Sequence, residues 1–272
     1  MPELPEVEVI RQDLARRVVG RRIRRVEITE PRLTRRRGTP RRVEMALAGH
    51  SVKALRRRGK CFVFNLGQDS LVIRLGMTGQ LLWRQGDEDV RPDRHTHARF
   101  LFSGNNVLAY RDIRKFGEIF LLPTKDVERI LSLGVEPLEA SFTPEMLRRV
   151  CGSSSKIKPL LLDQAKIAGI GNIYADEALF RAGIRPTRRA SSLRAEEIRA
   201  LQRAIRAVLL AGIRHRGSSI SDYRDADGQP GRFVPLHRVY RRHGKPCVRC
   251  GTPIRRIILG QRGTHFCPTC QR

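Results

Sequence analysis

The sequence lacks any long apolar run. No stretch approaches the ~18 apolar residues of a membrane-spanning helix, and no basic leader followed by an apolar segment opens the chain. We therefore expect a cytoplasmic protein that has no membrane partner. At 272 residues the chain can hold a substantial core and two domains, which excludes a mainly disordered tail.

Acidic residues and lysines are also scarce. The chain has 27 Asp and Glu against 54 Lys and Arg, a formal net charge of +27, and only eight of the basic residues are lysine. The other 46 are arginine, which binds phosphate through a bidentate fork. The charge therefore favours nucleic acid as the partner. An acidic membrane surface, or an arginine-rich genome bias with no partner at all, remains an alternative.

Cysteines are few, and most lie at one end. Four of the six fall within the last 26 residues, as the pairs Cys247/Cys250 and Cys267/Cys270 with sixteen residues between the pairs. Each Cys-x-x-Cys pair can turn two thiolates toward one point, and four thiolates complete a tetrahedral zinc shell with no open position. The pattern predicts one structural Zn²⁺ rather than a disulfide scaffold. Disulfides or a thioredoxin-like redox pair are the alternatives.

Apolar periodicity predicts a helix followed by a β-rich domain. Apolar residues recur at helical spacing from Leu4 to Val18, so a helix should end near Gly20. Short β-type runs follow as far as Pro123, which is typical of a β-sandwich or barrel. The expected strands cover residues 23–28, 51–55, 61–66, 71–75, 80–83, 98–102, 107–111 and 118–122, with a hairpin turn at 103–106.

The periodicity becomes helical after Pro123. A polar, glycine-rich loop at 217–235 interrupts it, and loops of this length are usually functional or disordered. Between the cysteine pairs a hairpin is expected, with Arg262 at its tip, 260–263. The expected helices cover 125–133, a segment starting at Thr143-Pro144, 158–166, 173–182, and a long segment capped by Ser192.

Pro2 allows two interpretations. It can simply open the helix, where its missing N–H costs nothing and where Glu3 and Glu6 favour the positive end of the dipole. If Met1 is removed, however, Pro2 carries a free secondary amine, and an α-amino group titrates near ~8, well below a lysine. The attack of such an amine on a sugar carbon gives an iminium ion, which accepts electrons.

Five motifs follow one another along the chain: Pro-Glu-Leu-Pro-Glu-Val-Glu at 2–8, Leu-Gly-Met-Thr-Gly at 75–79, Asp-Ile-Arg-Lys-Phe-Gly at 112–117, Gly-Ile-Gly-Asn-Ile-Tyr-Ala-Asp-Glu at 169–177 and Gln-Arg-Gly-Thr-His-Phe-Cys-Pro-Thr-Cys-Gln at 261–271. Together they resemble the bacterial formamidopyrimidine-DNA glycosylases, a family that repairs 8-oxoguanine. The resemblance runs from end to end, and it depends on the order of the motifs rather than on any one of them.

The resemblance implies an α+β multidomain fold. Residues 1–133 would hold the N-terminal helix and a β-sandwich, and residues 134–141 would be a linker. Residues 142–236 would form a helix-two-turn-helix domain with a lesion-recognition loop at 217–235, and residues 237–272 a four-cysteine zinc finger with a β-hairpin. The implied partner is double-stranded DNA with oxidised bases, bound by a monomer at the nucleoid.

A catalytic set is implied as well. Pro2 would attack C1′ of the damaged nucleotide, expel the oxidised base and hold the sugar as a Schiff base. Glu3 would act as acid and base at the sugar, and Glu6, one helical turn further on, would orient or tune the amine. Lys60 and Arg262 would contact the phosphates beside the lesion and assist β- and δ-elimination.

Met77, Arg114 and Phe116 match the residues that fill the gap left by the everted base. Spacing alone favours a different interpretation of Met77 and Phe116, because isolated apolar residues usually belong to the core. His95 matches a histidine that contacts DNA, although His95 and His97 can also be ordinary polar surface.

Two further positions match phosphate contacts of the family. Asn172 lies in a glycine-rich turn before a helix, where free amides favour an anion, and Lys158 would bind the same strand. Lysines often precede the Ile-Lys-Pro segment in the family. Here the preceding segment is Cys-Gly-Ser-Ser-Ser-Lys at 151–156, so the usual DNA contact either falls to Lys156 or is absent.

Two other functions stay open. A sister glycosylase of the endonuclease VIII type shares Pro2 and Glu3 but prefers oxidised pyrimidines, and Leu4 with the pair Arg114 and Phe116 favours the purine enzyme. A zinc-ribbon DNA-binding protein without catalysis would explain the charge and the cysteines. Such a protein has no need of an acid–base group beside Pro2.

Overall fold

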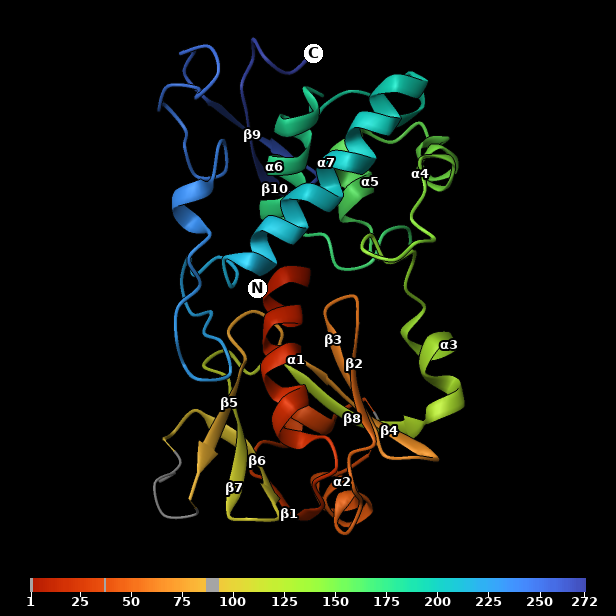
Figure 1. The fold of residues 1–272 in the computed structure, drawn as a ribbon, viewed down its shortest axis with the longest axis vertical. Coiled ribbons are helices and arrows are strands. Elements are labelled where there is room, and N and C mark those ends of the chain that lie inside the picture. The colour runs from red at the N-terminus through yellow and green to blue at the C-terminus, as the bar shows by residue number, and fades with distance from the viewer. Residues whose placement is uncertain (1, 37, 87–92) are drawn as a thin grey trace. The chain divides into compact units, whose positions relative to one another are not determined.

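The computed structural model describes residues 2–36, 38–86 and 93–272, which form two compact units (Figure 1). The first unit combines the chain up to Ser132 with a returning segment, His215–Arg232; the second combines Leu133–Arg214 with Phe233–Arg272. This division differs from the expected domains in two places. The glycine-rich loop packs with the first unit rather than with the helices before it, and the cysteine-bearing hairpin belongs to the second unit.

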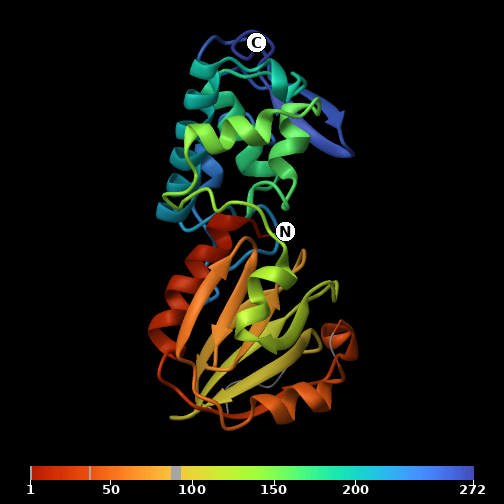
Figure 2. The same cartoon turned by 90° about the vertical axis from the view of Figure 1, so that its right-hand side faces the viewer.

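Two four-stranded antiparallel sheets make up most of the first unit (Figure 2). One sheet has the order β1-β6-β7-β5 and the other β2-β3-β4-β8. They share one apolar core, in which Phe62, Phe64, Phe100 and Tyr110 are at most 1% exposed, so the expected β-sandwich is confirmed. The strands are β1 (Ile23–Ile28), β2 (Ala54–Arg58), β3 (Cys61–Asn65), β4 (Asp69–Arg74), β5 (Gln80–Gln85), β6 (Thr96–Phe102), β7 (Asn106–Arg111) and β8 (Glu118–Pro123).

Helix α1 (Leu4–Val18) packs against β2 and β3, and it confirms the expected N-terminal helix, which ends two residues before Gly20. Its apolar residues recur every three or four positions and so share one face, on which Ile10 and Leu14 are completely buried. Burial of each such side chain stabilises the fold by ~1.5–3 kcal/mol. Beyond the helix Gly20 has a φ of +81°, a conformation that favours glycine and lets the chain turn toward β1.

Two short helices, the 3-10 helix η1 (Pro31–Thr34) and α2 (Pro40–Leu47), lie between β1 and β2. The apolar pattern does not predict α2, because only its residues Val43 and Leu47 are buried. The start of α2 is marked instead by Thr39, whose hydroxyl accepts the N–H of Arg42.

Two expected elements of the first unit are displaced or divided in the structure. The second strand covers 54–58 instead of 51–55, because Ser51 forms only an isolated bridge with Arg22. The helix expected at 125–133 is divided into the 3-10 helix η2 (Thr124–Asp126) and α3 (Val127–Leu131). It stops at Ser132, which adopts a positive φ of 45°.

The second unit contains four α-helices and a two-stranded hairpin. Helix α6 packs against both α7 and β10, so it connects the helices to the hairpin. Within residues 2–36, 38–86 and 93–272, no helix is long and apolar enough to cross a membrane. The elements are α4 (Pro144–Cys151), α5 (Ile157–Leu162), α6 (Asn172–Ala182), α7 (Ala195–Arg214), the 3-10 helices η3 (Ala190–Ser192) and η4 (Val234–Leu236), β9 (Arg255–Leu259) and β10 (Arg262–Phe266).

Ser192 does not cap α7, contrary to expectation. It lies in η3, where its hydroxyl donates to the carbonyl of Arg189. The N–H of Arg194 is accepted by the Glu197 carboxylate at 2.8 Å, so Glu197 satisfies a free amide at the start of α7. Helix α5 ends at Leu162 rather than at 166, because the next residue leaves the helical conformation.

Candidate active site

Three of the residues expected to carry the chemistry, Pro2, Glu3 and Glu6, lie just before or within the first turn of α1. Pro2 is buried, and Glu3 and Glu6 are only 4% and 1% exposed. The Glu6 carboxylate accepts the backbone N–H of Glu3 at 2.9 Å through Oε2, so it fixes the backbone next to Pro2. The dipole interpretation of the two glutamates and a catalytic one are compatible, because the same carboxylates lie at the positive end of the helix.

The second oxygen of Glu6 binds the returning loop. Its Oε1 accepts the N–H of Ser218 at 2.8 Å. The ring of Tyr223 lies beside this contact, because a Cβ added at Gly217 would come within 2.9 Å of both the Glu6 side chain and that ring. Burial raises the pKa of the Tyr223 hydroxyl, and the charges of Glu6 and Asp225 raise it further. Glu6 therefore joins the start of α1 to the loop.

Lys60 lies half-buried in the tight turn between β2 and β3. Arg57 fixes this turn, because its guanidinium donates to the Gly59 carbonyl at 3.0 Å and to the Glu8 carboxylate on α1 at 3.1 Å. Burial alone would raise the pKa of Glu8, but hydrogen bonds and charges from Arg11, Gln12 and Arg57 lower it overall. The sequence interpretation missed Glu8 and Arg57, since single charged residues on a helix or strand carry no distinctive pattern.

Met77, Arg114 and Phe116 lie together at the surface. The Arg114 guanidinium is 4.6 Å from the centre of the Phe116 ring and 3.2 Å from the Met77 sulfur. Met77 is 41% exposed and Phe116 50% exposed, so the interpretation of both as core residues is wrong. Two apolar side chains held out beside a guanidinium can act as a wedge between stacked bases.

Asp112 organises the two loops that carry this cluster. It is completely buried, and its carboxylate accepts the Thr78 hydroxyl, the Arg114 N–H at 3.2 Å and the Gly117 N–H at 2.9 Å. The loops also cross closely, because a Cβ at Gly76 would come within 2.6 Å of the Phe116 backbone. Asp112 opens the motif at 112–117, but the sequence predicts no role for it; its position directly after a buried strand is the one local signal of such a centre.

His95 is half-buried next to these loops, and its carbonyl accepts the N–H of Asp112 at 2.9 Å. Its ring contacts the Arg94 guanidinium at 3.1 Å. His97, in contrast, is 5% exposed and bonds the Asp112 carbonyl through Nε2 at 3.0 Å. Polar surface is therefore the wrong interpretation for His97, which supports the Arg114 loop from within.

In the second unit, Asn172 and Lys158 meet at the hairpin. Both donate to the Gly263 carbonyl at 3.0 Å, and Lys158 also donates to the Thr264 hydroxyl at 2.8 Å. The Asn172 Oδ1 is buried without a hydrogen-bond partner. Lys158 forms an ion pair with Asp176 at 2.7 Å.

The Lys158 side chain is 0% exposed and its ammonium is directed at internal acceptors, so in this structure it supports the hairpin. Its expected phosphate contact stays a prediction. Lys156, two residues earlier, is exposed at the start of α5, so it is the lysine of this segment that can reach a phosphate.

Arg262 is exposed at the start of β10. The hairpin tip is shorter than expected: Gly260 and Gln261 alone connect β9 to β10, with φ values of 54° and 59°. Two positive φ values in a two-residue connection are typical of a type I′ turn, which matches the twist of the strands. This turn holds Arg262 next to the end of a stiff ribbon.

Four cysteines form a compact cluster in the second unit. Their Sγ atoms all lie within 4.8 Å of one another, with Cys247 and Cys270 at 3.9 Å and Cys250 and Cys267 at 3.5 Å. Tetrahedral zinc with Zn–S bonds of ~2.3 Å needs sulfurs ~3.8 Å apart, so the residues fit one structural zinc ion. The four thiols are free in this structure, as coordination of zinc by four cysteines requires.

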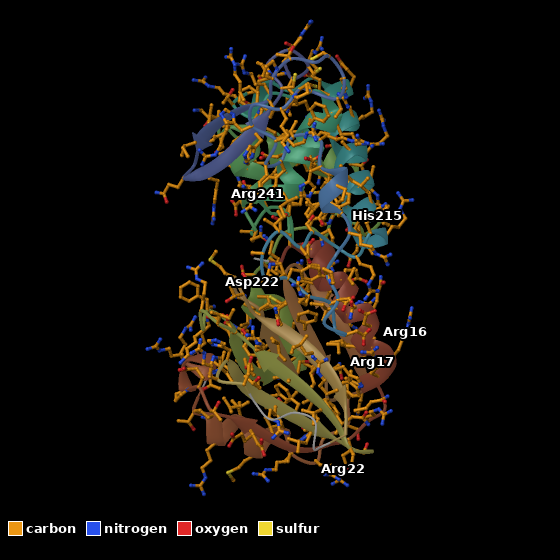
Figure 3. The ribbon with its side chains drawn as sticks, turned by 90° about the vertical axis from the view of Figure 1, so that its left-hand side faces the viewer. Arg16, Arg17, Arg22, His215, Asp222 and Arg241 are labelled. Carbon is orange, nitrogen blue, oxygen red and sulfur yellow. The ribbon has the colours of Figure 1, made fainter. Side chains whose placement is uncertain are left out.

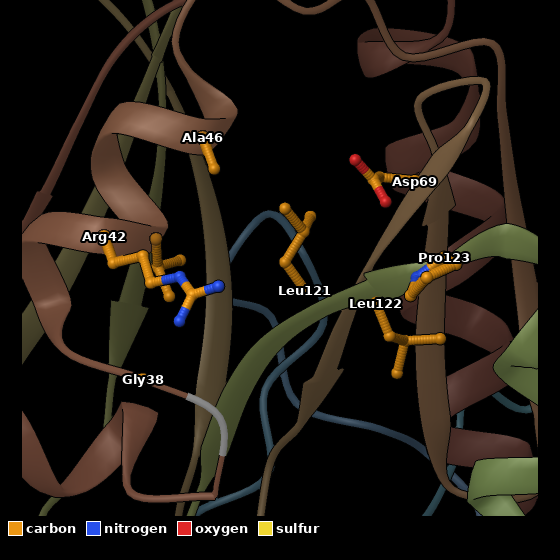
Figure 4. Close-up of a pocket in the computed structure, with 8 residues that line it drawn as sticks. Gly38, Arg42, Ala46, Asp69, Leu121, Leu122 and Pro123 are labelled. Carbon is orange, nitrogen blue, oxygen red and sulfur yellow. The ribbon is translucent and has the colours of Figure 1, made fainter.

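A pocket of about 570 Å³ opens in the first unit between α2 and the strands β4 and β8 (Figure 4). The guanidinium of Arg42 and the carboxylate of Asp69 lie at its sides, and Leu121 lies between them. Its lining is distinct from the predicted site residues. Charged side chains, mostly arginine, extend from the surface of both units (Figure 3).

Three family models match the chain. They describe the formamidopyrimidine-DNA glycosylase N-terminal domain over residues 1–119, the formamidopyrimidine-DNA glycosylase H2TH domain over 133–224, and a zinc finger found in FPG and IleRS over 244–272. The match to the zinc-finger model agrees with the geometry of the four cysteines.

Curated relatives are similar over the whole chain. The formamidopyrimidine-DNA glycosylase of Symbiobacterium thermophilum is 47% identical and that of Pelotomaculum thermopropionicum 44%, with all of this chain and 89% and 99% of the relatives covered.

Solved structures agree. A Lactococcus lactis FPG variant in complex with Fapy-dG containing DNA gives a TM-score of 0.92 at 36% identity, over 100% of both chains. The Lactococcus lactis Fpg with abasic-site DNA gives 0.91 at 36% identity, over 99% of both chains. From its first helix to its last cysteine, this chain belongs to the formamidopyrimidine-DNA glycosylase family.

Proposed function

We propose that this protein is a bifunctional DNA glycosylase and apurinic-site lyase that removes oxidised purines, 8-oxoguanine and formamidopyrimidines, from duplex DNA. Membership of the family supports this substrate class. The observation that carries the proposal is the start of α1, where Pro2 is buried beside two carboxylates and Glu6 holds the backbone of Glu3. We further propose that the protein works as a monomer in the cytoplasm, at the nucleoid.

The first step needs Pro2 as a free secondary amine, which requires removal of Met1. The amine attacks C1′ of the damaged nucleotide, the bond to the oxidised base breaks, and the opened sugar remains as a Schiff base on Pro2. Glu3 protonates the sugar ring oxygen, a role that its position directly after the nucleophile supports. Glu6 orients this pair through its bond to the Glu3 backbone.

Two eliminations follow. The cationic Schiff base acidifies the neighbouring sugar proton, so first the 3′ and then the 5′ phosphate can leave. Lys60 and Arg262 stabilise these anionic leaving groups, and Arg262 does so from a hairpin that zinc stiffens when bound to the four cysteines. The product is a one-nucleotide gap with phosphates on both sides.

Base eversion leaves a gap in the stack, which costs a few kcal/mol unless it is filled. Met77 and Phe116 provide exposed apolar side chains for this purpose. Arg114 contacts both side chains and can donate hydrogen bonds to the orphaned cytosine.

Incision of defined duplexes tests the proposal. The protein should cut DNA at 8-oxoguanine opposite cytosine, leave phosphates at both ends of the gap, and cut thymine-glycol duplexes more slowly. A clear preference for thymine glycol would favour the sister enzyme for oxidised pyrimidines. If the protein binds both duplexes but cuts neither, the remaining interpretation is a zinc-ribbon DNA-binding protein without catalysis.

A further inference from the structure

The returning segment, His215–Arg232, is an ordered loop closed at its base. The N–H of Arg232 donates to the His215 carbonyl at 2.7 Å, and the N–H of Gly231 donates to the Ser219 hydroxyl at 2.8 Å. Inside the loop, Asp225 accepts two further backbone N–H groups through Oδ1, at 3.0 and 2.8 Å. The loop therefore has a defined shape of its own.

This loop is fixed to one stripe of α1. Ser218 donates to Glu6, Arg216 contacts Asp13, and Asp227 pairs with Arg17 at 2.7 Å. Positions 6, 13 and 17 are separated by two helical turns and then by one, so they lie on the same face of the helix. Arg17 on α1 and Asp222 in the loop are marked in Figure 3.

Arg216 is the centre of this attachment. Its guanidinium contacts Asp13 at 2.6 and 3.3 Å and Asp225 at 3.0 and 2.6 Å, so one cation bridges α1 and the middle of the loop. The side chains of Asp13 and Asp225 are only 12% and 2% exposed, which limits screening by water. The hydrogen bonds to Asp13 and then to Asp225 raise the pKa of Arg216 despite its partial burial.

The backbone at Arg216 is strained. Its φ of 56° lies in the left-handed region, which favours glycine. The next residue, Gly217, also has a positive φ, and a Cβ there would come within 2.8 Å of Glu6 Oε1. Strain of this kind persists where surrounding contacts determine the conformation, and the two carboxylates around Arg216 supply such contacts.

We propose that Arg216, Asp13 and Asp225 form a clamp that holds the loop in the one conformation in which Ser218 reaches Glu6, and that this clamp sets the rate of base excision. The proposal rests on the proposed function. The loop would close over the everted base, so a loop that is already ordered loses less conformational freedom when the base enters. Elimination at a site that has already lost its base gains little from the loop. Arg216 is thus a positioning residue, separate from the residues that react.

Two substitutions at position 216 separate the clamp from the backbone. Arg216→Gly relieves the strained φ but removes the guanidinium, whereas Arg216→Lys keeps the charge and the strain. Arg216→Gly should lower kcat/KM for 8-oxoguanine excision roughly tenfold and leave cleavage of a preformed abasic duplex within about twofold. Arg216→Lys should retain more of the excision rate, and Asp13→Asn should add little to Arg216→Gly because both remove the same contact.

Glu27→Gln is the matched control. It breaks the ion pair between Glu27 and Arg99, 3.1 Å long and remote from the loop, and both activities should stay at wild-type level. An equal loss of excision and abasic-site cleavage in Arg216→Gly would overturn the proposal, as would no loss at all.

Hydrogen exchange tests the clamp without relying on activity. In Arg216→Gly the amides of residues 218–231 should exchange faster than in wild type and Arg216→Lys, while those of β3 stay unchanged. Unchanged loop exchange would overturn the clamp. A wild-type protein that is inert on both DNA substrates but shows this exchange pattern would contradict the proposed function and support the clamp.

Discussion

Lys158 and Asp176 form an ion pair of 2.7 Å in which neither side chain is exposed. The other oxygen of Asp176 accepts the backbone N–H of His265 in β10 at 2.9 Å, so the pair joins α5, α6 and the hairpin. Moving two charges out of water is costly, and such a pair is tolerated only where further bonds complete it. The hairpin that carries Arg262 therefore rests on buried charges.

Replacing Lys158 by Met should destabilise the protein strongly. The substitution leaves the Asp176 carboxylate buried without its cation, which typically costs ~3–5 kcal/mol. Urea unfolding with zinc present measures the change in the free energy of unfolding. Lys156→Met is the matched control, since an exposed lysine should change that free energy by less than about 0.5 kcal/mol.

In the salt dependence of DNA binding, Lys156→Met should be the variant that changes and Lys158→Met the one that does not. An exposed lysine that neutralises one phosphate adds ~0.9 to the slope of log K against log salt. Lys156→Met should therefore lower the slope, whereas Lys158→Met should weaken binding with the slope unchanged. A lower slope for Lys158→Met alone would show that Lys158 does reach the DNA.

Phe116→Ala should cost activity and little stability. Half of this side chain is exposed, so its loss should change the free energy of unfolding by ~1 kcal/mol or less, while excision from duplex DNA should fall roughly tenfold. Phe120→Ala gives the contrast, because Phe120 is 2% exposed and its truncation should cost ~3–5 kcal/mol. A Phe116→Ala protein with normal excision would argue against a role in filling the gap.

Cys250→Ser should release the metal. The wild-type protein should contain one zinc ion per chain by elemental analysis, because four thiolates fit one tetrahedral site. The variant should lose zinc and bind duplex DNA more weakly, since the hairpin with Arg262 is no longer held. Cys151→Ala removes a buried cysteine outside the cluster and should keep its zinc. Zinc retained by Cys250→Ser at full stoichiometry would contradict the assignment.

The Glu197 carboxylate should make part of the free energy of unfolding depend on pH in the acid range. Hydrogen bonds from Arg188 lower its pKa from 4.5 to about 2, against a smaller opposing effect of burial. A lowered folded-state pKa means that the contribution is complete above pH 4.5 and is lost as the pH falls toward 2. The difference in unfolding free energy between wild type and Glu197→Gln should therefore be constant near neutral pH and shrink below pH 4.5. A difference that does not change with pH would exclude this ion pair as its source.

Periodicity and spacing predicted the elements that rest on repeated local signals. Helix α1 has five regularly spaced apolar residues, and the paired cysteines form a metal cluster that their spacing predicts. Short α2 escaped prediction because two buried residues make no recognisable period. Only the resemblance predicted that Met77 and Phe116 are exposed, because a single apolar residue gives no periodic signal that separates a core position from a surface one.

Long-range contacts lay beyond the sequence signals. The sequence around Lys158 does not indicate that its side chain is buried. Its ion pair with Asp176 follows only from the fold. The attachment of Arg216 to Asp13 joins residues 203 positions apart, which no local pattern can indicate. Asp112 gathers donors from two loops for the same reason.

The central claim is that the nitrogen of Pro2 is the nucleophile, and borohydride trapping tests it most directly. The mature protein is incubated with duplex containing 8-oxoguanine opposite cytosine, reduced, digested and mapped by mass spectrometry. We expect a covalent sugar adduct on the nitrogen of Pro2 and none in a verified Met1-retaining form, which should bind the duplex without cutting it. An adduct on a lysine, or normal turnover by the Met1-retaining form, would show that the nucleophile lies elsewhere.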